Sequence, residues 1–174
     1  MKTVLTIAAT AATLILAAPG SAAPQNGNII ATVVTSPVHN TLEAAIKAAK
    51  LTSTLANSGP YTLFAPTDDA FAKLPAGTVE TLLKPENRDQ LRSILSYHVV
   101  PGRYTAAYIV QQINANGGSY ELTTLQGGTL TARLVDGKVV ITDASGGTAT
   151  VITADLNRMN GVVHVTDAVF LPSA

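Results

Sequence analysis

Three histidines are the side chains of this 174-residue chain with the clearest capacity for chemistry. An imidazole can act as a general base or bind a metal ion, but His39, His98 and His164 lie far apart in the sequence. His164 and Asp167 are three residues apart in an expected strand, where they face opposite sides and cannot bind one metal ion together. The chain has no cysteine, which excludes thiolate metal sites, a cysteine nucleophile and disulfides. We therefore predict no metal site and no cofactor.

Sequence motifs of catalysis are also absent. The chain contains no Gly-x-Ser-x-Gly elbow, no phosphate-binding loop, no dinucleotide-binding glycine pattern and no His-Glu-x-x-His zinc motif. Eleven basic and eleven acidic side chains give a net charge of zero, so no basic excess favours binding to nucleic acid. The sequence therefore predicts a protein that is not an enzyme and does not bind nucleic acid.

The start of the chain is typical of a secretory signal peptide. Lys2 precedes an uncharged apolar run over residues 4–18, and Gly20 and Ala22 are the small residues that a cleavage site near Ala22 or Ala23 requires. The apolar run is shorter than the roughly 20 residues of a membrane-spanning helix. We expect a protein secreted to the periplasm or the exterior, without a membrane anchor after cleavage, and monomeric. The expected division is a signal peptide over residues 1–22, a short tail over 23–27 and a single domain over 28–172.

Hydrophobic periodicity divides the remaining chain into a helical half and a strand half. Up to about residue 113 apolar side chains recur mostly at helical spacing, and Tyr61 to Ala65 forms one short apolar segment rich in strand-forming residues. From about residue 117 they alternate, and Asp136-Gly137 and Asn160-Gly161 are two-residue hairpin signals. Helices followed by hairpins predict an α+β fold with one shared core.

Two helix starts are predicted from residues that cap helices. Asn40 with Glu43 three residues later is typical of a capping box. Thr67 is typical of an N-cap, and Asp68 and Asp69 follow it in the first turn, where the helix dipole favours anions. The adjacent carboxylates are therefore interpreted as helix-start residues and not as a catalytic acid–base pair.

Three stretches of the sequence resemble the signature motifs of the fasciclin domain family. They are YTLFAPTDDAF at residues 61–71, LRSILSYHVVPG at 91–102 and NGVVHVTD at 160–167, in the family's order and spacing. The resemblance covers nearly all of the chain after the leader. It implies an antiparallel β-wedge or sandwich packed against a layer of several short α-helices. It also implies a non-enzymatic role in cell adhesion or in contact with surface or matrix material.

The resemblance further implies candidate contact residues. A Tyr-His pair and an Asp-Ile dipeptide are implicated in receptor contact in relatives, and the matching positions here are Tyr97, His98, Asp155 and Leu156. Leucine in place of isoleucine changes the shape of that position, so receptor specificity does not follow. The alternative for Tyr97 and His98, which the chemistry of the two rings favours, is a buried and hydrogen-bonded pair that joins helix to sheet.

Two binding hypotheses remain. The first is an exported adhesion module whose partner is a protein or a surface or matrix component. The second is a carrier of a small apolar ligand, because some relatives bind carotenoids between helix and sheet. Buried aliphatic side chains are, however, more often ordinary core than ligand contacts. The candidate lining residues for such a ligand are Ile109, Val110, Ile113 and Met159.

Overall fold

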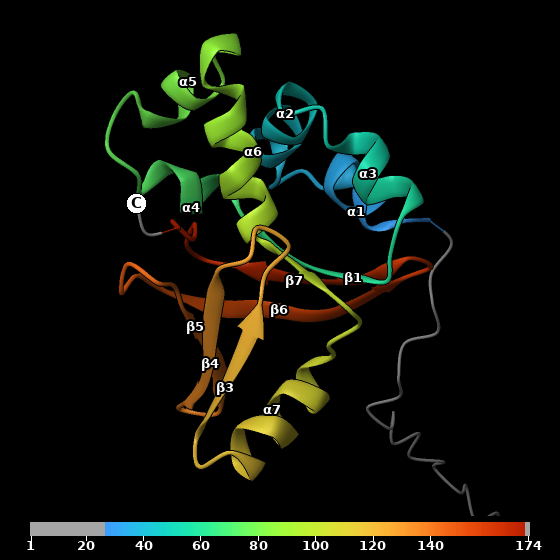
Figure 1. The fold of residues 1–174 in the computed structure, drawn as a ribbon, viewed down its shortest axis with the longest axis vertical. Helices are drawn as coiled ribbons and strands as arrows, with labels where there is room; N and C mark the ends of the chain where they lie inside the picture. The colour runs from blue at the N-terminus through green and yellow to red at the C-terminus, as the bar shows by residue number, and fades with distance from the viewer. Residues whose placement is uncertain (1–26, 173–174) are drawn as a thin grey trace, which may run out of the picture.

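The computed structural model describes residues 27–172, so the predicted signal peptide lies outside the described residues. A layer of short helices covers one side of a divided seven-stranded sheet, and a separate helix packs against strands at its other end (Figure 1). No helix between residues 27 and 172 is both long enough and apolar enough to cross a lipid bilayer.

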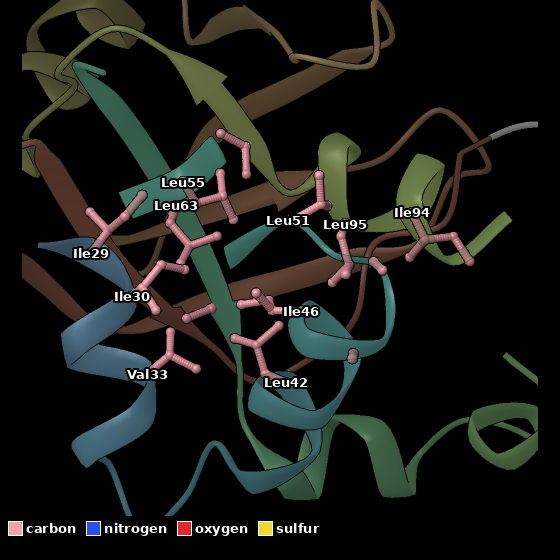
Figure 2. Packing of buried hydrophobic residues seen from close by; sticks show 14 of the residues in the cluster. Ile29, Ile30, Val33, Leu42, Ile46, Leu51, Leu55, Leu63, Ile94 and Leu95 are labelled. Carbon is pink, nitrogen blue, oxygen red and sulfur yellow. The ribbon is translucent and has the colours of Figure 1, made fainter. Parts of the chain in front are cut away.

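The helical layer consists of elements drawn from the first half of the chain. Its apolar side chains meet the sheet in a first core cluster that includes Leu42, Leu55 and Leu63, each no more than 2% exposed (Figure 2). The amphipathic patterns of the sequence thus supply one face of the core. The elements are α1 (Ile29–Thr35), α2 (Asn40–Ala48), α3 (Thr52–Asn57), α4 (Asp68–Ala72), α5 (Thr78–Leu82), the 3-10 turn η1 (Pro85–Asn87) and α6 (Arg88–Tyr97).

The sheet is divided because one strand belongs to two halves. β6 pairs with β5 through its first three residues and with β7 along the rest of its length. In Figure 1, β3, β4 and β5 run across the direction of β6 and β7. In sheet order the strands are β2 (Val99–Pro101), β1 (Tyr61–Pro66), β7 (Gly161–Thr166), β6 (Thr148–Arg158), β5 (Lys138–Thr142), β4 (Thr129–Val135) and β3 (Ser119–Thr123).

A second core cluster fills the space between the far half of the sheet and helix α7 (Ala106–Ala115). Ile109 and Ile113 of α7 meet Leu130 of β4 in this cluster, and each of the three is no more than 1% exposed. Each half of the divided sheet is therefore covered by its own helical element.

The α+β fold class is confirmed, with one difference in the pairing. β1 and β7 run parallel, with Tyr61 opposite Gly161 and Pro66 opposite Thr166, whereas all other strand pairs are antiparallel. The Asp136-Gly137 hairpin is confirmed, since both residues have positive φ, 51° and 75°, as the tight turn requires.

The predicted caps met different outcomes. Thr67 caps α4 as expected, because its hydroxyl accepts the N–H of Ala70 at 3.3 Å. The capping box at Asn40 is wrong: the Asp68 carboxylate instead accepts the backbone N–H groups of Asn40 at 3.3 Å and Thr41 at 2.7 Å. Partial burial works against ionisation of Asp68, but these hydrogen bonds outweigh it and hold its pKa below the ordinary value. Asp68 thus fixes the start of α2 from a distant part of the chain.

Candidate functional site

Tyr97, at the end of α6, is fully buried between the helical layer and the far half of the sheet. Its hydroxyl donates to the carbonyl of Thr129 at 2.8 Å and accepts the N–H of Ala144 at 2.9 Å. Burial raises the pKa of the Tyr97 phenol. A Cβ at Gly128 would lie 2.6 Å from the Tyr97 ring, so the absence of a side chain at this glycine of the β3–β4 turn makes room for the ring. Tyr97 joins helix to sheet, as the second interpretation of this residue predicts.

We expect Tyr97→Phe to lower the free energy of unfolding by about 2 to 4 kcal/mol, because it leaves a buried donor and a buried acceptor without partners. Urea denaturation followed by circular dichroism measures the change. Tyr61→Phe is the matched control, since the Tyr61 hydroxyl makes no hydrogen bond within residues 27–172 and its loss should cost less than about 0.5 kcal/mol. Equal effects of the two variants would contradict the assigned role of Tyr97.

His98 is also buried, with 1% of its surface exposed. Its Nδ1 lies 2.8 Å from the carbonyl of Ile94, and its Nε2 accepts the N–H of Phe170 at 3.0 Å. These contacts fix the tautomer with the proton on Nδ1, because a carbonyl can only accept and an amide N–H can only donate. Burial lowers the pKa of His98 to about 4, so the ring is neutral at pH 7.

His164 and Asp155 form a second group, at the junction of β6, β7 and α7. The Asp155 backbone N–H donates to His164 Nδ1 at 3.3 Å, and His164 Nε2 lies 2.7 Å from the carbonyl of Tyr104. The Asp155 carboxylate accepts the N–H of Ala106, the first residue of α7, at 2.7 Å. Burial lowers the pKa of His164, which keeps this ring neutral as well. The group fixes the start of α7 on the sheet.

The four residues implied by the family resemblance therefore fall into two places. No hydrogen bond or ring contact joins Tyr97 or His98 to Asp155 or Leu156 within the described chain. Leu156 is half-buried against the first core cluster, and Asp155 is half-buried at the head of α7. An approaching partner meets the surroundings of the Tyr97 and His98 rings and not the rings themselves.

The candidate ligand residues do not surround a common space. Ile109 and Ile113 lie in the second core cluster, Val110 packs at its edge, and Met159 is 72% exposed at the β6–β7 turn. An open cleft with a volume of about 560 Å³ lies in another part of the molecule. It is bounded by the α1–α2 connection, by the start of α4 and by β6. Pro37, Val38, Ile152, Leu156 and Val165 form its apolar wall. We call this space the α1–β6 cleft.

A group of tyrosine side chains that come together only in the folded chain was not identified from the sequence. The rings of Tyr104 and Tyr108 have centroids 5.7 Å apart, and those of Tyr108 and Tyr120 are 6.4 Å apart. Beside them, the Arg103 guanidinium donates to the carbonyls of Arg158 at 2.9 Å and Met159 at 3.2 Å. The i, i+4 spacing of two tyrosines in the sequence is the one local signal of this arrangement. We call Arg103, Tyr104, Tyr108, Tyr120 and Met159 the tyrosine face.

The described part of the chain contains no cluster of side chains suited to bind a metal ion. Between residues 27 and 172 no three His, Asp or Glu side chains lie close enough together to hold a metal ion. Both ring nitrogens of His98 and of His164 are occupied by hydrogen bonds, to Ile94 and Phe170 and to Tyr104 and Asp155. The His39 ring is hydrogen-bonded to Ser36 through Nδ1, while its buried Nε2 has no hydrogen-bond partner within residues 27–172.

The protein thus has a layer of short helices on a divided seven-stranded sheet, with a buried Tyr-His pair between them. The model of the Fasciclin domain family matches residues 37–172, and the chain belongs to this family. Protein sll1483 of Synechocystis sp. is 53% identical over 133 residues, which cover 76% of this chain and 67% of that protein. Cell surface glycolipoprotein MPB83 of Mycobacterium bovis is 32% identical over 162 residues, 90% of this chain and 66% of that protein.

A solved structure supports the same fold. The FAS1 domain pair of the insect cell adhesion molecule Fasciclin I superposes with a TM-score of 0.73 at 23% identity. The match covers 85% of this chain and 51% of the Fasciclin I structure, so this chain spans about half of that pair. One relative is thus named for the cell surface, and a protein with the same fold is named for cell adhesion.

Proposed function

We propose that this protein is an exported, non-enzymatic adhesion module that binds a protein or a surface or matrix component. The names of a cell-surface relative and of a cell adhesion molecule with the same fold support the class of function. The tyrosine face is the proposed contact surface, and it is the structural observation on which the proposal depends. Tyr, Arg and Met are enriched where proteins contact one another, and Tyr and Arg dominate binding energies at such contacts.

The tyrosine face is held in place before any partner arrives. Arg103 ties the β6–β7 turn, which carries the exposed Met159, to the segment that leads into α7. Asp155 and His164 fix the backbone on which Tyr104 stands. A rigid surface loses little conformational entropy on binding, so more of the contact energy contributes to affinity. Asp155 thereby acts as a positioning residue for the proposed contact.

Charge plays a small part in this proposal. The chain has a net charge of zero, so bulk electrostatic attraction does not assist attachment. Apolar and local polar contacts through Tyr108, 40% exposed, and Met159, 72% exposed, supply the affinity instead. Attachment should therefore depend only weakly on salt concentration.

The double variant Tyr108→Ser with Met159→Ser should weaken attachment at least tenfold, because each side chain is expected to contribute about 1 kcal/mol or more. The protein is displayed on a host cell, and its attachment to envelope and matrix fractions of the source organism is measured by flow cytometry. Val135→Ser is the matched control, since Val135 is 50% exposed at the β4–β5 turn and is not part of the tyrosine face. Wild-type attachment by the double variant, or no attachment by the unsubstituted protein, would overturn the proposal.

A carrier of a small apolar ligand is the second candidate function, and the α1–β6 cleft is the observation that favours it. The cleft's volume of about 560 Å³ lies in the range of small-molecule sites, roughly 300 to 1,000 Å³. Visible colour in protein purified from its native host, or uptake of added carotenoid, supports this function. A colourless preparation that takes up none contradicts it.

A further inference from the structure

The α1–β6 cleft combines an apolar wall with an acidic end. Val38 and Ile152, which both line the cleft, are 48% and 55% exposed, so two aliphatic side chains are open to solvent in one concave space. Asp68 and Asp69, at the start of α4, complete the lining. The cleft therefore offers a place both for an aliphatic body and for a polar head.

Carboxylates are the charged side chains among the residues that line the cleft. His39 also lines it, and burial lowers the pKa of its ring, while Arg158 donates from its Nε to the lining residue Thr32. The Asp68 carboxylate is occupied by Asn40 and Thr41.

Asp69 differs from Asp68 in having a free carboxylate. Its side chain is exposed and makes no hydrogen bond or ion pair within residues 27–172. A carboxylate beside an apolar surface attracts a cation and repels an anion. The cleft is thus complementary to a ligand with an apolar body and a positive end.

We propose that the α1–β6 cleft binds amphiphiles, with the aliphatic body between Val38 and Ile152 and a cationic head group paired with Asp69. This inference rests on the carrier function and specifies its ligand class. It places the ligand away from Ile109, Val110 and Ile113, which belong to the packed core.

The test uses displacement of the neutral dye Nile red by two ten-carbon amphiphiles of opposite charge, decylammonium and decanoate, at low salt. Nile red should bind the wild-type protein with enhanced fluorescence. Decylammonium should displace it at a concentration about five- to tenfold lower than decanoate, as expected for one exposed charge pair. Asp69→Asn should reduce this preference to within about twofold and leave Nile red affinity unchanged.

A second pair of variants locates the site. Ile152→Asn should weaken Nile red binding at least fivefold, whereas the equally exposed Val135→Asn should not change it. Unchanged dye binding by Ile152→Asn would overturn the proposed place. Equal displacement by the two amphiphiles would overturn the cationic ligand class and leave the carrier function standing. Absence of Nile red binding to the wild-type protein would overturn both the cationic ligand class and the carrier function. If the protein dimerised at higher concentration and dye binding fell as it did so, a second copy of the chain would occupy the cleft, and both would again be overturned.

Discussion

Gly161→Ala is expected to prevent folding or to lower the free energy of unfolding by about 4 kcal/mol or more. A Cβ at this position would lie 1.9 Å from the carbonyl oxygen of Tyr61 and 2.9 Å from its carbonyl carbon. Both atoms belong to the backbone of β1, which pairs with β7 in register, so neither can move without breaking the centre of the sheet. Losses of this size arise from a few causes, and overpacking against fixed atoms is one. Far-UV circular dichroism and thermal denaturation measure the outcome.

Gly137→Asn is the matched control for this variant. Gly137 has a φ of 75° in the β4–β5 turn, and a Cβ there would meet no atom within 4 Å. Asparagine tolerates this conformation, so the cost should stay below about 1 kcal/mol. If Gly161→Ala folded with the stability of Gly137→Asn, the parallel register of β1 and β7 would be wrong.

Asn160, beside Gly161, explains why the Asn-Gly pair is more than a hairpin turn. Its Oδ1 accepts the N–H of Ile29 at 2.9 Å, and its Nδ2 donates to the carbonyls of Leu55 at 2.6 Å and Ser58 at 3.1 Å. One amide thus joins the start of α1 and the end of α3 to the sheet. This pair is a junction of three elements.

Acidification should destabilise the protein between pH 6.5 and pH 4, chiefly through His98. The unfolded chain binds a proton at the ordinary histidine pKa of 6.5, whereas the buried ring in the folded protein does so only near pH 4. Stability is therefore complete above pH 6.5 and falls as the pH drops toward 4, by about 3 kcal/mol from this residue. The pKa values of His39 and His164 are lowered by burial too and act in the same direction.

The variant His98→Gln isolates this contribution. It removes one titrating group, so the slope of unfolding free energy against pH between 4.5 and 6 should decrease by about 1 kcal/mol per pH unit, whatever the variant's overall stability. Denaturant titrations at several pH values measure the slope. Asp68 does not interfere, because its pKa lies below its ordinary value of 3.8. An NMR titration of wild type in which the His98 ring protonates near pH 6.5 would contradict the expectation.

Local signals in the sequence predicted the elements that depend on local chemistry. The Asp136-Gly137 turn and the Thr67 cap follow from residues next to them in the chain, and both are present. The strand at 61–65 follows from composition, and the structure has it as β1.

Features that depend on contacts between residues far apart in the chain could not be predicted from local sequence patterns. The start of α2 is fixed by Asp68, 28 residues from Asn40, so the nearer Glu43 suggested the wrong cap. β6 extends over Thr148–Arg158 through irregular pairing with β7 that an alternating pattern of apolar residues does not show. The tyrosine face and the α1–β6 cleft likewise combine residues far apart in the chain. The family resemblance pointed to Tyr97 and His98, but their burial and hydrogen bonds depend on distant residues that the motifs do not include.

The parallel pair of β1 and β7 also sets how this domain carries tension. The Gly27 carbonyl accepts the N–H of Met159 in the β6–β7 turn, the last described segment follows the end of β7, and the two ends of the described chain lie on opposite sides of Figure 1. A pull along β7 loads its hydrogen bonds to the parallel strand β1 together, in shear, and does not open them one after another. Resistance to such a pull depends on the rate of unfolding and not on equilibrium stability. A domain that anchors one surface to another is under this kind of load whenever the surfaces are drawn apart.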